Sequence, residues 1–196
     1  MSIPDRLLHS LCGGDSGCVE RALSFLSYVD RLERLVKELP KPELSGYDPP
    51  LIERVTNLDL LESEARRVAE GDEDTVSYLV RRRVFLEHGR EIQNAWHGST
   101  CPVCGLLPTL MLYRPSDKGL FSGYHPHYRC VCGAEWPGRD WRCPRCGEEG
   151  RNAFETLILT SSLEARRCVR CSYVIPIIER ETLQIHKLHL LVMLFL

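Results

Sequence analysis

Eight cysteines lie in four close pairs between residues 101 and 171, and thiols at this spacing can bind metal ions. The segments CPVCG, CVCG, CPRCG and CVRC supply them: Cys101, Cys104, Cys130, Cys132, Cys143, Cys146, Cys168 and Cys171. A Cys-x-x-Cys turn followed by Gly lets both sulfurs face one cation while backbone N–H groups point at them. Tetrahedral zinc or iron accepts four such sulfurs at about 2.3 Å. The cysteine count therefore predicts two metal ions, zinc or iron, each in a four-thiolate site.

The four pairs can be combined into two sites in more than one way. Chain order gives one site of Cys101, Cys104, Cys130 and Cys132 and another of Cys143, Cys146, Cys168 and Cys171; interleaved pairing is the alternative. The second pair is short, because only Val131 separates its cysteines, but residues two apart in an extended chain point to one face and can reach one ion. His125 or His127 could otherwise replace a thiolate there. We expect any redox or regulatory chemistry at this irregular site.

A disulfide framework is the alternative use of these cysteines. Cys-x-x-Cys pairs followed by Gly or Pro are typical of metal knuckles, and the opening MSIPDRLLHS lacks the apolar core of a secretory signal. We therefore expect a reducing, cytoplasmic location. Cys12 and Cys18 stand apart from the pairs, so we expect them to be core or surface thiols rather than metal ligands.

The residues between the cysteines alternate between strand-forming segments and turns. After CPVCG come the strand-like LLPTLMLY, a turn at RPSDKGLFSG, the strand YHPHYRC and AEW. After CPRCG come AFETLILT, a turn at SSLEA and RRCVRCSYVIPII. A knuckle, a hairpin and a second knuckle thus occur twice, which is typical of tandem zinc-ribbon or rubredoxin-like units. We expect the first metal ribbon at residues 98–139 and the second at 140–180.

The elements that must carry these ribbons are helical. Apolar residues follow a helical period over three stretches: from Asp15 or Ser16 to Pro40, from Pro49 or Pro50 to Gly71, and from Asp72 or Asp74 through Trp96. We expect a helical bundle at residues 1–97, with the run Arg81, Arg82 and Arg83 on a solvated helix face. The terminal LHLLVMLFL predicts a buried C-terminal helix at 181–196, too short for the roughly 20 residues that span a bilayer. The predicted fold class is α+β.

Composition and charge narrow the classes of function. The chain of 196 residues is 43% hydrophobic and 27% charged, as soluble globular proteins are. Residues 97–180 carry 11 Lys and Arg against 8 Asp and Glu, but two four-thiolate ions would take this net charge from +3 to roughly −1, which argues against nucleic acid as a partner. We also expect no enzyme and no catalytic residue, because paired carboxylates, an activated nucleophile and a phosphate loop are all missing from the sequence.

The order of the cysteine motifs resembles that of a known family. CPVCG opens the series, CGAEW follows a YRC strand, and then come WRCPRCG and a final CxxCxY before an aliphatic strand. In this order, and in the helical segment GCVERALSFLSYVDRLERL, the chain resembles the formate dehydrogenase accessory proteins (the FdhE family) over about half its length. The resemblance places the metal role on seven of the eight cysteines, while Cys130 is offset by one position from the usual pair. The chain is also shorter than typical members.

The resemblance implies a cytoplasmic, rubredoxin-like metal-binding protein needed for the maturation of formate dehydrogenase. Its expected partner is the catalytic subunit, a molybdenum or tungsten pterin protein, of formate dehydrogenase or a related oxidoreductase. Two alternatives stay open. One is electron transfer by iron in a four-cysteine site. The other is a nucleic-acid-binding ribbon that would use Arg129, Arg139, Arg142, Arg145, Arg166, Arg167 and Arg170.

Overall fold

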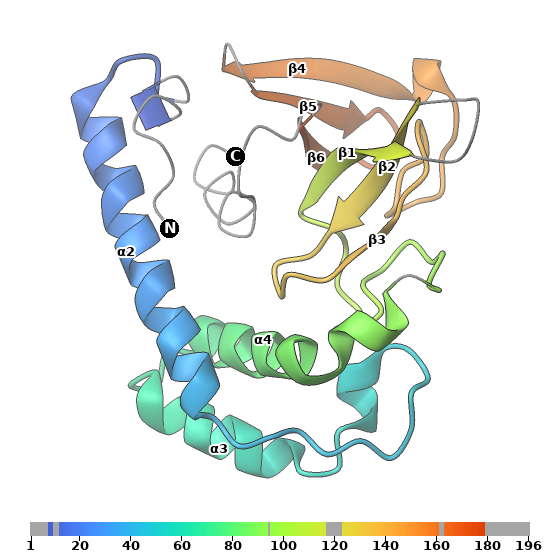
Figure 1. The fold of residues 1–196 in the computed structure, drawn as a ribbon. Helices are drawn as coiled ribbons and strands as arrows, with labels where there is room; N and C mark the ends of the chain where they lie inside the picture. Colours follow the sequence, from blue (N-terminus) through green and yellow to red (C-terminus); the bar gives the residue numbers. More distant parts are fainter. Residues whose placement is uncertain (1–7, 10–11, 94, 117–122, 161–162, 179–196) are drawn as a thin grey trace.

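The protein has a mixed α+β architecture, with helices in the first half of the chain and one sheet in the second half (Figure 1). This is a computed structural model, and it describes residues 8–9, 12–93, 95–116, 123–160 and 163–178. The predicted fold class is therefore confirmed. The predicted C-terminal helix at 181–196 lies outside the described residues.

Two of the three predicted helices begin where the sequence places their capping residues. Helix α2 (Ser16–Glu38) is capped by Asp15, whose carboxylate accepts from the backbone N–H of Gly17 at 2.8 Å. Helix α4 (Glu73–Ile92) is capped by Asp72, whose carboxylate accepts from the backbone N–H of Thr75 at 3.2 Å. Each cap satisfies an N–H that has no partner within the helix. Helix α4 ends at Ile92, so the helical period that reaches Trp96 overstates its length.

The predicted second helix is broken into two pieces. Residues Leu51–Arg54 form the short 3-10 helix η1, and helix α3 spans Leu58–Val68. Between them Val55 is extended and forms an isolated bridge with Leu44. The backbone N–H of Thr56 also donates to the carbonyl of Glu43 at 2.8 Å. These contacts come from a distant loop, so the apolar period of this stretch gives no sign of the break.

Helices α2, α3 and α4 share a core of aliphatic side chains. Its buried members are Leu32, Val36, Leu39, Leu61, Ala65, Val76, Leu79 and Val80. Only the C-terminal part of α2 contributes to this core, and Figure 1 shows the rest of α2 extending beyond α3 and α4. The described helices therefore do not form a bundle along their full length.

All six described strands belong to one sheet in the order β3-β2-β1-β6-β5-β4. The first ribbon supplies β1 (Leu110–Ser116), β2 (Gly123–Arg129) and β3 (Glu135–Pro137), and the second supplies β4 (Phe154–Thr160), β5 (Leu163–Cys168) and β6 (Val174–Ile178). The predicted strands are confirmed, although β5 already begins within the SSLEA segment that the sequence marks as a turn.

The two ribbons are joined by a parallel strand pair. Strand β1 lies beside β6, with Met111 opposite Ile177 and Leu112 opposite Ile178, whereas all other pairings in the sheet are antiparallel. The repeat in the sequence predicts two tandem units, and the structure places them side by side in a continuous sheet. The domain boundaries stay a prediction.

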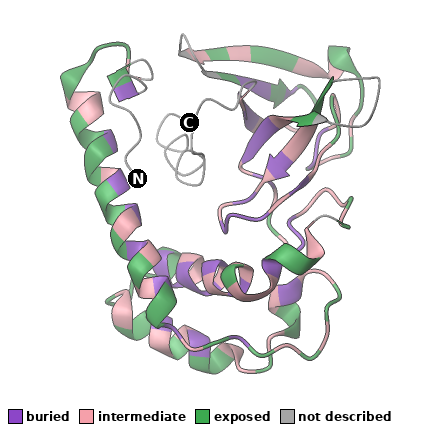
Figure 2. Cartoon of the chain, viewed as in Figure 1, coloured by how far each residue is buried: buried purple, intermediate pink, exposed green. Residues whose placement is uncertain are grey.

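The second hydrophobic core lies between the sheet and the helical half. It joins Leu51 of η1 and Val84 of α4 to Met111, Tyr128 and Trp136 of the sheet, and it includes the four cysteines of the first pair of knuckles. Figure 2 shows buried residues on the inner side of α4 and on the strands. None of the helices in the described part of the chain is both long and apolar enough to cross a lipid bilayer.

Candidate metal centres

The eight paired cysteines gather into two groups of four thiols. The first group is Cys101, Cys104, Cys130 and Cys132, and the second is Cys143, Cys146, Cys168 and Cys171; within each, the sulfur atoms lie within 4.8 Å of one another. This is the pairing in chain order, and the interleaved alternative is not found. Neither His125 nor His127 belongs to a group. His127 Nδ1 instead lies 3.6 Å from a carboxylate oxygen of Glu135.

The sulfur separations fit one metal ion in each group. Two close Sγ contacts occur in each group: Cys101 with Cys132 at 3.6 Å and Cys104 with Cys130 at 3.3 Å, and Cys143 with Cys171 at 3.5 Å and Cys146 with Cys168 at 3.6 Å. Four sulfurs about 2.3 Å from a tetrahedral ion lie roughly 3.8 Å apart, so each group needs only a small expansion. The two four-cysteine groups can therefore hold two metal ions. The thiol donors suit zinc and iron alike.

Backbone hydrogen bonds set the shape of each knuckle. In the first, the N–H of Cys101 donates to Leu106 O at 2.7 Å and the N–H of Gly105 donates to Cys101 O at 2.9 Å. The knuckles that begin at Cys143 and Cys168 have the same two bonds. A left-handed residue closes each turn, and this explains the glycines after the cysteines; at the last knuckle Ser172 takes this conformation, with φ 58°.

The irregular knuckle keeps this pattern with one residue fewer. The N–H of Cys130 donates to Ala134 O and the N–H of Gly133 donates to Cys130 O, both at 2.9 Å. Gly133 closes the turn with φ 96°. The missing residue thus shortens the loop without removing a thiol from the group.

The two groups differ in their burial. Cys101, Cys104, Cys130 and Cys132 are all buried, with at most 7% exposure. In the second group Cys143 and Cys168 are fully buried, but Cys146 and Cys171 are half-buried. The irregular site, where the sequence predicts redox or regulatory chemistry, is thus the less accessible of the two. Its cysteines take part in the core between sheet and helices, and the sequence carries no sign of that packing.

The thiols of the second group also differ in their pKa values. Burial raises the pKa of the Cys143 thiol to about 12. The backbone N–H of Glu148 beside Cys146 lowers the pKa of that thiol to about 7. The two thiols of this knuckle therefore differ in pKa as well as in burial.

One arginine connects the first group of thiols to the helical half. Arg82 of α4 is 8% exposed, and its Nη1 donates to the carbonyl of Cys132 at 2.9 Å. Its Nε and Nη2 donate to the two carboxylate oxygens of Glu33 on α2 at 2.8 and 3.0 Å. Tyr78 OH donates to the same carboxylate at 2.7 Å. The prediction that the arginine run lies on a solvated face is wrong for Arg82, because the irregular knuckle packs on α4 at this point. It is also wrong for Arg83, whose side chain is 11% exposed and whose Nε donates to Leu39 O at 3.1 Å.

Cys12 and Cys18 form a disulfide, which corrects the prediction of free thiols. Gly13 and Gly14 both have positive φ, and this turn brings the two Cα atoms to 5.6 Å. The pair of glycines between the cysteines is the signal in the sequence that could have indicated the bond. Disulfides persist mainly in oxidising surroundings, so this one counts against the reducing compartment that the sequence predicts.

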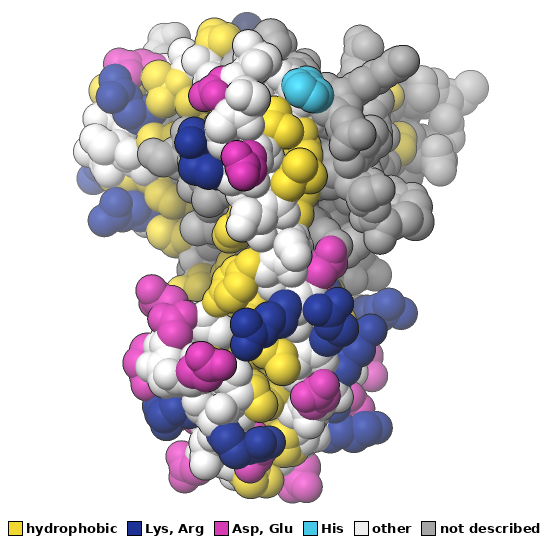
Figure 3. All heavy atoms as spheres, turned by 90° about the vertical axis from the view of Figure 1, so that its left-hand side faces the viewer, with side chains coloured by type: hydrophobic (Ala, Val, Ile, Leu, Met, Phe, Trp, Pro, Cys, Tyr) yellow, Lys and Arg dark blue, Asp and Glu magenta, His cyan; other side chains and the backbone are white. Residues whose placement is uncertain are grey.

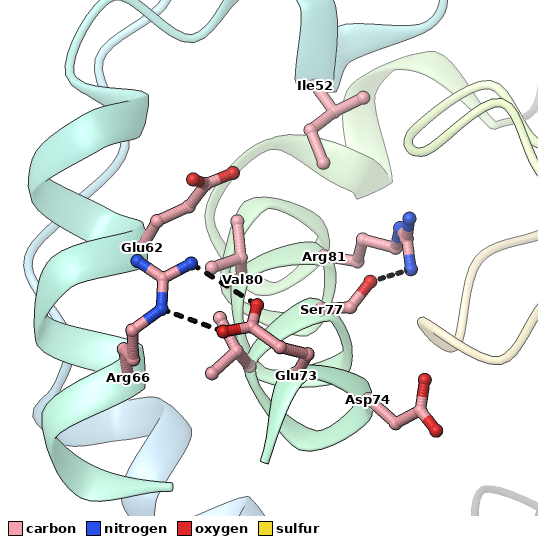
Figure 4. Close-up of a pocket in the computed structure, with 9 residues that line it drawn as sticks. Ile52, Glu62, Arg66, Glu73, Asp74, Ser77, Val80 and Arg81 are labelled. Carbon is pink, nitrogen blue, oxygen red and sulfur yellow. Dashed lines mark hydrogen bonds and ion pairs between the residues drawn. The ribbon is translucent and has the colours of Figure 1, made fainter. Parts of the chain in front are cut away.

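A separate cavity of about 320 Å³ lies between α3 and α4 (Figure 4). Its charged groups already bind one another: Arg66 donates to both carboxylate oxygens of Glu73, at 2.9 and 3.2 Å, and Arg81 donates to Ser77. The remaining acids, Glu62 and Asp74, lie on either side of the cavity (Figure 4). This arrangement provides neither a nucleophile with a base nor a free cationic cradle.

Comparisons with known proteins identify no relative of this chain. No family model matches the chain, and neither the curated proteins nor the solved structures contain a match.

Proposed function

We propose that this protein is a metal-binding accessory protein that assists formate dehydrogenase, or a related molybdenum or tungsten oxidoreductase, by binding its catalytic subunit. The observation that carries the proposal is the pair of complete four-thiol groups built into one sheet. Metal bound at both would brace the sheet and the knuckles around it, because the free energy of metal binding becomes free energy of folding. The product is a rigid platform for a partner.

The two complete four-thiol groups favour a platform for binding a partner over an enzyme. Four thiolates fill the coordination of a tetrahedral ion, which leaves no position for a substrate or an activated water. The cavity between α3 and α4 has its two arginines bonded to neighbouring side chains. Both observations support a role in binding rather than in catalysis.

The identity of the partner rests on the order of the cysteine motifs and on the Glu-Trp pair after the second one. Trp136 of that pair is fully buried, and its indole N–H donates to Gly98 O at 3.0 Å. Tyr128 of the preceding strand packs against it with ring centroids 5.9 Å apart. Trp136 is one of the residues that carry the resemblance to the formate dehydrogenase accessory proteins. Its hydrogen bond attaches the first ribbon to the segment that follows α4.

A nucleic-acid-binding role is less well supported. Of the seven arginines that it would use, five are close to acids: Arg129 to Glu135, Arg142 to Glu149, Arg166 to Asp140, Arg167 to Glu155 and Arg170 to Glu148. Such pairs reduce the charge available to phosphates. On the face in Figure 3, positive and negative side chains are mixed over the helical half.

Electron transfer is the second candidate, and one observation favours it. Cys146 and Cys171 are half-buried, so an iron ion in the second site would lie near the surface, where a redox partner could approach. This function predicts a coloured protein with a reversible visible band. A colourless zinc protein would rule it out.

Purification without oxygen tests the proposal. We expect the native protein to contain two equivalents of metal and to retain the catalytic subunit of formate dehydrogenase or of a related oxidoreductase. The Cys143→Ser/Cys146→Ser variant serves as the matched control and should retain less of the subunit. If fully metal-loaded protein does not bind the subunit at micromolar concentrations, the accessory role is wrong. Binding to DNA or RNA that falls steeply with salt would favour the alternative.

A further inference from the structure

The first group of thiols is covered by the helical half of the protein. The backbone N–H groups of Leu51 and Ile52 in η1 donate to the carbonyls of Pro102 and Val103, inside the first knuckle, at 3.0 and 2.8 Å. On the other knuckle, Arg82 of α4 donates to Cys132 O. These contacts leave the four cysteines at most 7% exposed, so the helical half shields them from molecules in solvent.

The second group is less covered than the first. Three of the four residues between its cysteines are exposed, namely Arg145 in one knuckle and Val169 and Arg170 in the other, with Val169 59% exposed, whereas Pro144 is buried. The ion pair between Arg170 and Glu148 bridges the two knuckles at 2.9 Å, but the side chain of Arg170 is 67% exposed. Exposed ion pairs of this kind contribute little to stability and break readily.

We propose that the second group is an exchangeable metal site, whereas the first is a permanent structural one. The inference rests on the proposed loading of both groups with metal. Cys146 and Cys171 are the ligands that open, because these residues are half-buried, while the fully buried Cys143 and Cys168 would hold the ion. The ligands that this site would exchange with are soft donors, such as the thiols of a partner protein or a chelator.

The exchange is a substitution of one donor for another. In such an exchange the Sγ of Cys146 would give up its place on the ion, with its electron pair, to a donor atom of the incoming molecule. Where that donor is a thiol, the proton that it loses on binding would balance the thiolate of Cys146 that is set free. Cys171 follows in the same way. No electron is transferred, so the step needs no oxidant or reductant.

Metal release from the whole protein tests this difference. Protein loaded with zinc to two equivalents under anaerobic conditions is mixed with an excess of a chromogenic zinc chelator. We expect two phases of equal amplitude, the first at least roughly tenfold faster, because release from the first site waits for local opening of the helical half. Circular dichroism should retain the helical signal after the first equivalent has left.

Variants and labelling assign the phases. Cys143→Ser/Cys146→Ser should lose the fast phase and keep the slow one, and Cys101→Ser/Cys104→Ser should do the reverse. In the unaltered protein, N-ethylmaleimide added with one equivalent of chelator should label Cys146 and Cys171 before any cysteine of the first group, so the test does not depend on the folding of a variant.

The outcomes separate this inference from the proposed function. Fewer than two equivalents at the start would contradict the two-metal platform itself. Two equivalents that leave in a single phase, or early labelling of Cys101 or Cys104, would overturn the exchangeable site alone.

Discussion

At the scale of single residues, Arg82 has the most consequential contacts. One side chain binds the knuckle of the first metal site through Cys132 O and binds α2 through Glu33. Because the Glu33 carboxylate already neutralises the guanidinium, the bond to Cys132 O acts as a structural link rather than as a counter-charge. The residue therefore attaches the site to the helices.

Replacement of Arg82 tests this role. We expect Arg82→Met to lower the free energy of unfolding by about 3 kcal/mol, the lower end for breaking a buried ion pair, because Glu33 keeps 20% exposure. Arg66→Met is the matched control, since it breaks an equally well formed pair, with Glu73, on the surface. Chemical denaturation measures both. Equal effects of the two changes would show that burial of the Arg82 pair is unimportant.

Two glycines in equivalent places of different knuckles give a second test. Both Gly133 and Gly147 have positive φ, so alanine should cost about 1–2 kcal/mol of backbone strain at either position. At Gly133 the added Cβ would also overlap the guanidinium of Arg82, whereas at Gly147 it would meet no atom within 4 Å. Since Glu33 holds the guanidinium in place, thermal denaturation should show a larger loss for Gly133→Ala. A larger loss for Gly147→Ala would contradict the close packing of α4 on the irregular knuckle.

His127 predicts a pH dependence of stability. Burial lowers its pKa in the folded protein below the usual value of about 6.5. As the pH falls, the unfolded chain therefore binds a proton at a higher pH than the folded protein does. The free energy of unfolding consequently decreases below about pH 6.5. His127→Gln removes this loss, and its unfolding free energy should fall less than that of the unaltered protein between about pH 8 and pH 6. Parallel pH profiles would exclude a contribution from His127.

At the scale of elements, the sequence identifies most helices and strands because their signals are local. The caps Asp15 and Asp72, and the strand-forming residues between the knuckles, predict the elements that the structure contains. The break between η1 and α3 and the parallel pairing of β1 with β6 depend on segments far away in the chain. The spacing of apolar residues within one segment cannot indicate contacts with a distant segment.

The contact of α4 with the first knuckle predicts how loss of metal would spread. In Cys101→Ser/Cys104→Ser, amide hydrogen exchange should rise not only in residues 97–136 but also in α4 around Arg82, because the knuckle that binds Arg82 is no longer held. Strands β4 and β5 should keep their protection, since the second site remains complete. Hydrogen exchange read by mass spectrometry checks both regions. Unchanged exchange in α4 would mean that the helices do not depend on the first site.

At the scale of the whole molecule, the candidate sites were more predictable than their surroundings. Close cysteine pairs specify the ligands and their number because metal coordination demands four sulfurs near one point. Which site is buried was not predictable, because burial arises where Leu51, Val84 and Trp136 pack together from three separate regions of the chain. The Cys12–Cys18 bond differs from the sequence prediction for another reason. Six positions separate the two cysteines, and the turn between them depends on the positive φ angles of Gly13 and Gly14 rather than on a recognised cysteine spacing.

Two four-sulfur metal sites, with their ligands paired in chain order, are the feature on which the proposed function depends most. X-ray absorption at the edge of the bound metal, combined with the metal content of anaerobically purified protein, tests this directly. We predict two equivalents, each surrounded by four sulfurs at about 2.3 Å and no nitrogen, with one equivalent lost in each double Cys→Ser variant. A content below two, or a nitrogen ligand from histidine, would contradict the account.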